Sequence, residues 1–325
     1  MIGRFVATGA LPGDDRVQRL VDDVHARWRD ERGGACSTVY PALAAADPDR
    51  FGLSLAAVSG VVAWAGDHDV PFPIMSVVKP FVLALVVDRV GVEVIRSEVG
   101  LDATGGRFNE VGSLERTGGL SNPMVNAGAL ATIARFGDPG ADVEARWDEL
   151  RDRLGAFAGH PLPVDEEVLA SARATNRRNR SIALLLGDLG VIPGEPSDVV
   201  ELYTRACCLA VSTDDLAALG AVLADGGVHP VTGEQVVSAD ACRQVLAVMA
   251  TAGMYETSGQ WLVDVGLPGK SGIAGGILTI APGKGGLAAW SPPLDPAGNS
   301  VRGQRATADL SRALGLDLFA SQPDR

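Results

Sequence analysis

The sequence predicts an α+β fold, in which an antiparallel sheet built from both ends of the chain is flanked by helices and adjoins a mostly helical lobe. Short runs rich in β-branched and small apolar residues lie near the start of the chain and again near its end, at Phe51–Val58, Val61–Ala65, Ile273–Ile280 and Gly286–Trp290. Between these runs, apolar residues recur mainly at helical spacing. Strands from the two ends can therefore pair in one sheet.

The length of 325 residues suits one large domain or two lobes. We predict a single domain over 1–325. Its sheet lobe is expected at about 36–75 and 256–325, and its helical lobe at about 76–255. The cleft between the two lobes is the expected position of a binding or active site.

The first elements follow from simple patterns. An amphipathic helix is expected over about 15–30, where apolar residues recur at helical spacing: Val17, Leu20, Val21, Val24 and Trp28. Ser59-Gly60 joins the first two strands as a hairpin signal. The polar turn 66–69 follows, and its residues Asp67 and Asp69 are candidate metal ligands, although a solvated turn is the commoner use of such a pattern.

The middle of the chain is expected to be helical. The nearly all-apolar run from Phe81 to Val90 predicts a buried helix. Pro80 disfavours helical dihedral angles at Lys79, so this helix is expected to begin at about Ser76–Val77. Asn126, before a run of small residues, is either a helix cap or a substrate-binding amide, and the cap is favoured on physical grounds. Further helices are expected at 141–154, within 166–186, and at 198–209 and 239–250, with a capping signal at 212–215 and a glycine C-cap at Gly253.

After Tyr255 the pattern changes to short β runs separated by proline and glycine. Strands are predicted at Trp261–Val265, Ile273–Ile280 and Gly286–Trp290, joined as two hairpins. The segment 283–285 is a turn and not a phosphate-binding loop, because the Walker spacing is absent. A final amphipathic helix is expected over about Arg305–Leu314.

Composition excludes several classes of function. A net charge of −12 leaves no basic stripe for nucleic acid and disfavours anionic membrane surfaces. The N-terminal residues lack the apolar core of a signal peptide, and no apolar run is long enough to span a bilayer. The cysteines form no Cys-x-x-Cys pair and the histidines no metal-ligand spacing. We expect a cytoplasmic protein without a metal.

Ser76 and Lys79 lie three residues apart in an apolar run, a spacing that places both on one face of a helix. Burial disfavours a charged ammonium, so Lys79 can lose its proton and activate the serine. Only three of the 28 Lys and Arg residues are lysines, Lys79, Lys270 and Lys284, and arginine cannot release its proton. The alternative is structural, with Ser76 as an N-cap and Lys79 reaching to solvent.

A second lysine motif, Lys270-Ser271-Gly272, stands late in the chain. An early Ser-x-x-Lys with a late Lys-Ser-Gly resembles the serine β-lactamase and penicillin-binding fold. Longer motifs lie around this pair, in order: Phe108-Asn109, Leu114-Glu115, the run 122–129, Arg178-Asn179-Arg180, Gly253-Met254-Tyr255, the run 265–277, Ser291-Pro292-Pro293-Leu294 and Gly298-Asn299-Ser300. Together they resemble the bacterial and mitochondrial glutaminase family over about 39–314.

The resemblance implies a mechanism in which Ser76 attacks the side-chain amide of glutamine, Lys79 takes its proton and Tyr255 relays a proton to ammonia. The backbone N–H groups of Ser76 and Ile273 would form the oxyanion hole. Substrate-binding positions carried over from the family are Asn126, Asn179, Tyr203 and Ile273, with Lys270 and Ser271 in support. The family also implies a small-molecule amide substrate, no cofactor or metal, and a homo-oligomer, either a dimer or a tetramer.

Three positions depart from the family pattern. The motif Gln-Ser-Ile-Ser-Lys reads Met75-Ser76-Val77-Val78-Lys79 here, Val39 stands where the family has tyrosine, and Ala172 replaces a glutamate that resembles the partner of the substrate's ammonium. Losing such a charge-assisted hydrogen bond costs about 1.5–3 kcal/mol. Three hypotheses stay open: a glutaminase, the same chemistry on an amide or ester without a free α-amino group, and a non-catalytic paralogue.

Overall fold

The computed structural model describes residues 11, 13–60, 62–103, 117–138 and 140–320. Within them, one antiparallel sheet has the strand order β2-β1-β7-β6-β5. Its strands are β1 (Gly52–Ala57), β2 (Val62–Gly66), β5 (Gly269–Ser271), β6 (Gly276–Ala281) and β7 (Gly285–Trp290). The predicted fold class is confirmed, because β1 from the start of the chain pairs directly with β7 from its end.

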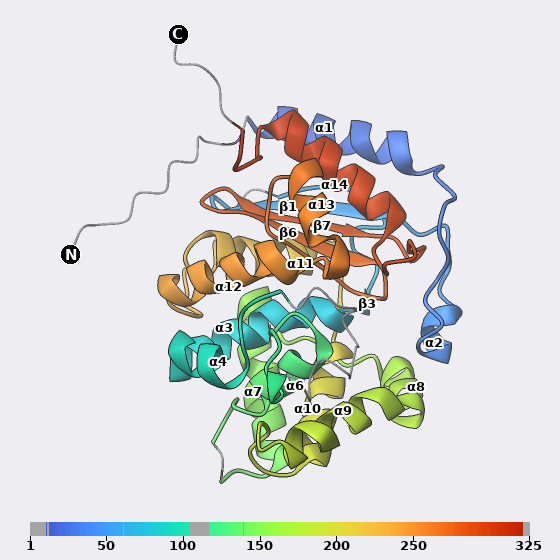
Figure 1. Ribbon diagram of the computed structural model, residues 1–325. Helices are drawn as coiled ribbons and strands as arrows, with labels where there is room; N and C mark the ends of the chain where they lie inside the picture. Colours follow the sequence, from blue (N-terminus) through green and yellow to red (C-terminus); the bar gives the residue numbers. More distant parts are fainter. Residues whose placement is uncertain (1–10, 12, 61, 104–116, 139, 321–325) are drawn as a thin grey trace, which may run out of the picture.

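Helices cover both faces of this sheet (Figure 1). The terminal helices α1 (Asp14–Trp28) and α14 (Val301–Leu314) pack together on one face, as expected from their apolar stripes. On the other face lies α11 (Thr213–Ala224), against β1, β6 and β7. The approach is close because β7 carries Gly286, where an added Cβ would lie 2.4 Å from the carbonyl oxygen of Ala217.

Most of the remaining helices build the lobe below the sheet in Figure 1, whereas α13 (Ser258–Asp264) lies at the level of the sheet. Before it, the short α2 (Pro41–Ala44) packs against α8 at the side of the molecule. The helices of the lobe and of the segment that leads back to the sheet are α3 (Lys79–Val90), α4 (Val92–Glu98), α6 (Asn126–Ile133), α7 (Val143–Ala158), α8 (Glu166–Thr175), α9 (Arg177–Asp188), α10 (Pro196–Cys207), α12 (Ala239–Ala252) and α13 (Ser258–Asp264).

A small ribbon ties the sheet side to the helical lobe. Strand β3 (Phe72–Pro73) pairs antiparallel with β4 (Ala210–Val211), which directly follows α10. The N–H of Ile74 then donates to the carbonyl of Leu209 at 2.8 Å. The segment that leads into Ser76 is thereby fixed against the end of α10.

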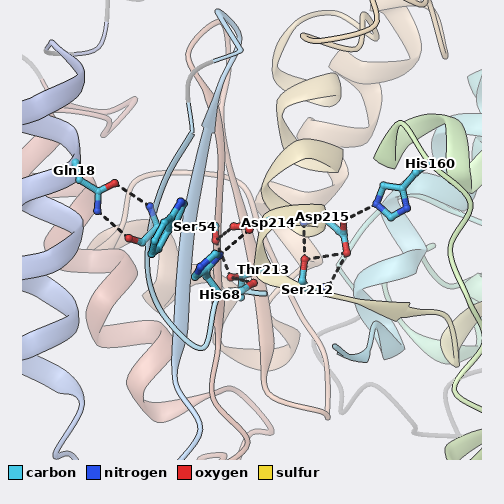
Figure 2. A network of polar contacts seen from close by, with 9 residues as sticks. Gln18, Ser54, His68, His160, Ser212, Thr213, Asp214 and Asp215 are labelled. Carbon is cyan, nitrogen blue, oxygen red and sulfur yellow. Dashed lines mark hydrogen bonds and ion pairs between the residues drawn. The ribbon is translucent and has the colours of Figure 1, made fainter. Parts of the chain in front are cut away.

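A polar network at the start of α11 joins the same two regions (Figure 2). On the sheet side, Asp214 accepts a hydrogen bond from Ser54 of β1 at 2.6 Å and contacts the ring of His68 at 2.7 Å. On the lobe side, Asp215 contacts His160 at 2.7 Å. Asp215 also completes the predicted capping box with Ser212, which confirms that start signal.

One local prediction was wrong. Trp261–Val265 was predicted as a strand but lies in and just after the helix α13, where Trp261 is buried and Val263 is 79% exposed. The C-cap predicted at Gly253 is confirmed, and its φ of −73° shows a cap without the left-handed conformation. A Cβ there would lie 1.8 Å from the carbonyl oxygen of Gly269, so the glycine permits close contact between the end of α12 and β5.

The remaining expectations concern two sequence motifs, membrane-spanning helices and metal sites. The motifs at 108–109 and 114–115 lie outside the described residues. In the described ranges, no helix is long and apolar enough to cross a membrane. No group of three or more potential metal-binding side chains converges there either, and Asp67 instead accepts hydrogen bonds from Phe51 N–H and the Arg50 guanidinium.

Candidate active site

Ser76 lies in a 3₁₀ turn, η1 (Met75–Val78), which continues directly into α3. This agrees with the helix start expected at about Ser76–Val77, and Pro80 falls in the first turn of α3, where its missing N–H costs nothing. Met75 has φ +48°, a left-handed conformation that is strained for a side chain of this size. Backbone strain is therefore located directly beside Ser76.

Lys79 is 2% exposed and is held by two acceptors. Its Nζ donates to Asn126 Oδ1 at 2.8 Å and to the carbonyl oxygen of Met124 at 3.2 Å. Burial lowers the pKa of Lys79 to about 7, against a smaller opposing influence of Cys207. A neutral lysine has two N–H bonds and one lone pair, so both N–H bonds are used and the lone pair stays available as a base.

Asn126 does not cap its helix. It is the first residue of α6 and makes no capping hydrogen bond. Its amide instead connects Lys79 with the binding pocket, since Nδ2 donates to Asn179 Oδ1 at 2.9 Å and Oδ1 accepts from Tyr203 at 3.5 Å. The preference for a cap was wrong because a tertiary contact with a buried amine outweighs a local turn.

Tyr255 is the second residue with strained backbone, at φ +55°, and Met75 and Tyr255 are the two non-glycine residues with positive φ in the described chain. Burial raises the pKa of its phenol, and a hydrogen-bond interaction with Ser76 acts in the opposite direction. The phenol donates to the carbonyl oxygen of Ser271 at 3.1 Å. It therefore stays protonated while in contact with the serine.

Lys270 is the second buried amine of the site, with no exposed surface. Its Nζ donates to the carbonyl oxygen of Ser271 at 2.6 Å and lies 4.4 Å from the centre of the Tyr255 ring. Burial, with a further contribution from nearby Lys79, lowers the pKa of Lys270 well below its usual value. Repulsion between two neighbouring amines favours the neutral form of each.

These groups surround a cavity of about 120 Å³. Five of the residues predicted from sequence line it directly, and they come from η1, three helices of the lobe and the turn after β5: Ser76, Asn126, Asn179, Tyr203 and Ile273. Four further predicted residues lie behind these lining residues. Lys79 contacts Asn126, Tyr255 contacts Ser76, and both Tyr255 and Lys270 donate to the carbonyl oxygen of Ser271. The structure thus brings all the predicted site residues into one cluster.

Five lining residues were not predicted as site residues: Tyr40, Thr175, Asn176, Arg178 and Cys207. The tyrosine of the family pattern aligns with Val39, yet Val39 is 55% exposed, whereas the neighbouring Tyr40 is partly buried and lines the cavity. Cys207 lies four residues after Tyr203 on α10, and that helical spacing was the available signal. The cavity therefore still has a tyrosine side chain beside Val39, and Tyr40 supplies it.

The other two positions that depart from the family pattern are Met75 and Ala172, and both are buried. Met75 is fully buried and lines the cavity beside Ser76. Ala172 lies on α8 with no exposed surface. The next residue, Arg173, forms an ion pair with Glu201 of α10 across the helix interface. An apolar side chain thus occupies both positions where the family pattern has a polar one.

Comparisons with known proteins identify the family of the chain. The family model described as Glutaminase matches residues 34–319. The chain is 50% identical to "Glutaminase 2" of Yersinia pestis over 320 residues, covering 98% of this chain and 94% of that protein. It is 41% identical to a glutaminase of Brucella suis biovar 1, covering 95% and 97% of the two chains.

Solved structures show the same fold. A probable glutaminase, ybaS, superimposes with a TM-score of 0.93 at 38% identity, covering 95% of this chain and all of that one. A probable glutaminase from Bacillus subtilis in complex with 6-diazo-5-oxo-L-norleucine superimposes with a TM-score of 0.85 at 26% identity, covering 98% of this chain and all of the other.

Proposed function

The chain belongs to the glutaminase family, and from this premise we propose that it hydrolyses the side-chain amide of L-glutamine to L-glutamate and ammonia through an acyl-enzyme on Ser76. The observation that carries the catalytic assignment is Lys79, whose amine is buried and has both acceptors of its neutral form in place. Such a lysine can accept a proton near neutral pH.

In the first step, the Lys79 amine takes the proton of the Ser76 hydroxyl as Oγ attacks the amide carbon. Tyr255 contacts both Ser76 and the carbonyl of Ser271, so its phenol is placed to pass a proton to the departing nitrogen. The C–N bond breaks and ammonia leaves. The proton held by Lys79 then passes to the Tyr255 oxygen, which restores the neutral amine and the phenol. Water attacks the ester, Lys79 takes its proton and returns it to Ser76 Oγ as the ester C–O bond breaks, and the carboxylic acid product leaves.

The tetrahedral intermediate needs donors for its negative oxygen. We assign this oxyanion-binding role to the backbone N–H groups of Ser76 and Ile273. Neither N–H donates to a backbone carbonyl in the described turns and loops. Loss of one such donor typically reduces turnover by about 10²–10³-fold. The fixed start of η1 and the turn after β5 keep both donors in place.

Substrate binding is assigned to Asn126, Asn179, Tyr203 and Ile273, which line the cavity together. Asn179 Oδ1 accepts from Asn126, so the Nδ2 of Asn179 is the group left to donate to a carboxylate of the substrate. Lys270 and Ser271 support Tyr255 from β5.

Further features belong to the same proposal. The protein acts as a single domain over 1–325 with its site between sheet lobe and helical lobe, and without a metal or cofactor. It is a cytoplasmic homo-oligomer, a dimer or tetramer. The cytoplasmic assignment is supported by four free cysteines, three of them buried.

The test is Ser76→Ala, assayed for ammonia release from L-glutamine. We expect turnover to fall by at least about 10³-fold, because the nucleophile is lost. Ser97→Ala on the exposed face of α4 is the matched control and should keep full activity. Labelling by 6-diazo-5-oxo-L-norleucine, with the adduct located on Ser76 by mass spectrometry, separates a catalytic protein from a non-catalytic paralogue. Full turnover in Ser76→Ala would refute the mechanism.

A further inference from the structure

The described residues of the cavity offer no anion to the amino end of an amino acid. Glutamine carries both a carboxylate and an ammonium beyond its amide, and a binding site usually meets each with a group of opposite charge. Among the described residues that line the cavity, the charged side chain is Arg178, and there is no aspartate or glutamate. The α-ammonium of glutamine would therefore enter without a carboxylate partner.

The acidic side chain of α10 near this wall is already paired. Glu201 lies two residues before Tyr203, and its Oε1 accepts from Arg205 at 2.6 Å as well as from Arg173 of α8. Both arginines hold the carboxylate in the interface between α8 and α10. Glu201 therefore cannot turn toward the cavity without breaking two ion pairs.

The surroundings of the cavity favour negative charge instead. The charged side chain at its edge is Arg178, whereas the buried amines of Lys79 and Lys270 behind its wall are neutral. A carboxylate of the substrate gains from the Arg178 guanidinium and from the donor Nδ2 of Asn179. An ammonium in the same place loses water and meets no described carboxylate, which disfavours binding.

We propose that the preferred substrates of this site are ω-amides of dicarboxylic acids that carry no free α-ammonium, with glutaramate, the des-amino analogue of glutamine, as the simplest. The inference deepens the proposed function and rests on it. The reaction is unchanged: the C–N bond of the amide breaks, water supplies the hydroxyl of the new carboxylic acid, and ammonia leaves. What differs is the charge recognised at the far end.

The first experiment compares kcat/KM for glutaramate and L-glutamine with the intact protein at pH 8.5. Glutaramate fits wherever glutamine fits, since it only lacks the amino group. We expect kcat/KM to be about tenfold higher for glutaramate, the size of one unpaired charged contact. A higher value for L-glutamine overturns the inference, whereas hydrolysis of neither amide contradicts the proposed function itself.

The second experiment supplies the missing charge. Val39 lines the cavity and is 55% exposed, so Val39→Glu leaves the core intact, and Val39→Gln is the uncharged control of equal size. The ratio of kcat/KM for L-glutamine over glutaramate is expected to rise about tenfold in Val39→Glu and to stay near its wild-type value in Val39→Gln. Equal ratios in the two variants would overturn the inference.

Discussion

The two ends of the active-site cavity are built differently. At the reacting end, Ser76, Lys79 and Tyr255 are held by buried hydrogen bonds and by two strained backbone positions. At the outer edge of the recognition end, Val39 and Thr175 line the cavity and are exposed to solvent.

This difference shows which residues are free to change. Each group at the reacting end is fixed by several others, so replacing one leaves buried polar partners unsatisfied. Val39 and Thr175 can be exchanged with little effect on folding, because both side chains are exposed to solvent. We therefore expect substitutions to separate into effects on turnover at one end and effects on substrate choice at the other.

The largest effect is expected for Lys79→Met, which keeps the length of the side chain and removes the amine. Turnover should fall by about 10³-fold or more, since the proton of Ser76 then has no acceptor. The readout is kcat for ammonia release, with thermal unfolding as a check that the variant is folded. A folded variant with more than a tenth of wild-type kcat would contradict the role of Lys79.

Tyr255→Phe should have the next largest effect. It removes one hydroxyl and keeps the ring beside Lys270, so proton delivery to the leaving nitrogen is lost while packing is retained. Turnover is expected to drop by about 10²-fold with a smaller change in KM. Steady-state kinetics measure both, and a change confined to KM would assign Tyr255 to binding.

The pH profile tests the base directly. Lys79 must be neutral to accept a proton, and its pKa lies near 7 because it is buried. Log kcat/KM should therefore rise with slope one below about pH 7 and level off above it, a loss of about tenfold per pH unit on the acidic side. A flat profile between pH 5 and 9 would show that another group is the base.

The smallest effect is expected for Thr175→Ala at the recognition end. The Thr175 hydroxyl donates to the carbonyl of Ser171 in its own helix, and the residue is exposed. KM for L-glutamine should change by less than about threefold and kcat should stay the same. A large fall in kcat in this variant would mean that the two ends of the cavity are not independent.

Sequence patterns predicted the parts of the fold that depend on local chemistry. The hairpin of β1 and β2, the buried helix α3 and the capping box at Ser212 each follow from residues close together in the chain. The strand predicted at Trp261–Val265 was wrong because a short apolar run fits the spacing of a strand and of a helix equally well. Which of the two forms depends on what packs against the segment.

In the candidate site, too, local sequence predicted some residues, whereas others depend on tertiary packing. The spacing of Ser76 and Lys79 indicated a nucleophile and base, and the family motifs supplied Tyr255, Asn179 and the other members. Tyr40 was missed because alignment by position points to Val39, and only the course of the chain before α2 shows which of the two side chains meets the cavity. Local patterns do not carry that information.

The ribbon of β3 and β4 has a consequence for synthesis of the protein. It joins residues 72–73 to residues 210–211, and β1 must wait for β7 before its second edge is paired. Contacts between such distant segments form late in folding and slowly. A growing chain therefore carries Ser76 and Lys79 out of the ribosome long before the segments that orient them exist. If Ser76 and Lys79 act as proposed, we expect a chain that ends before β7 to hydrolyse no amide, because the sheet that supports the site is incomplete.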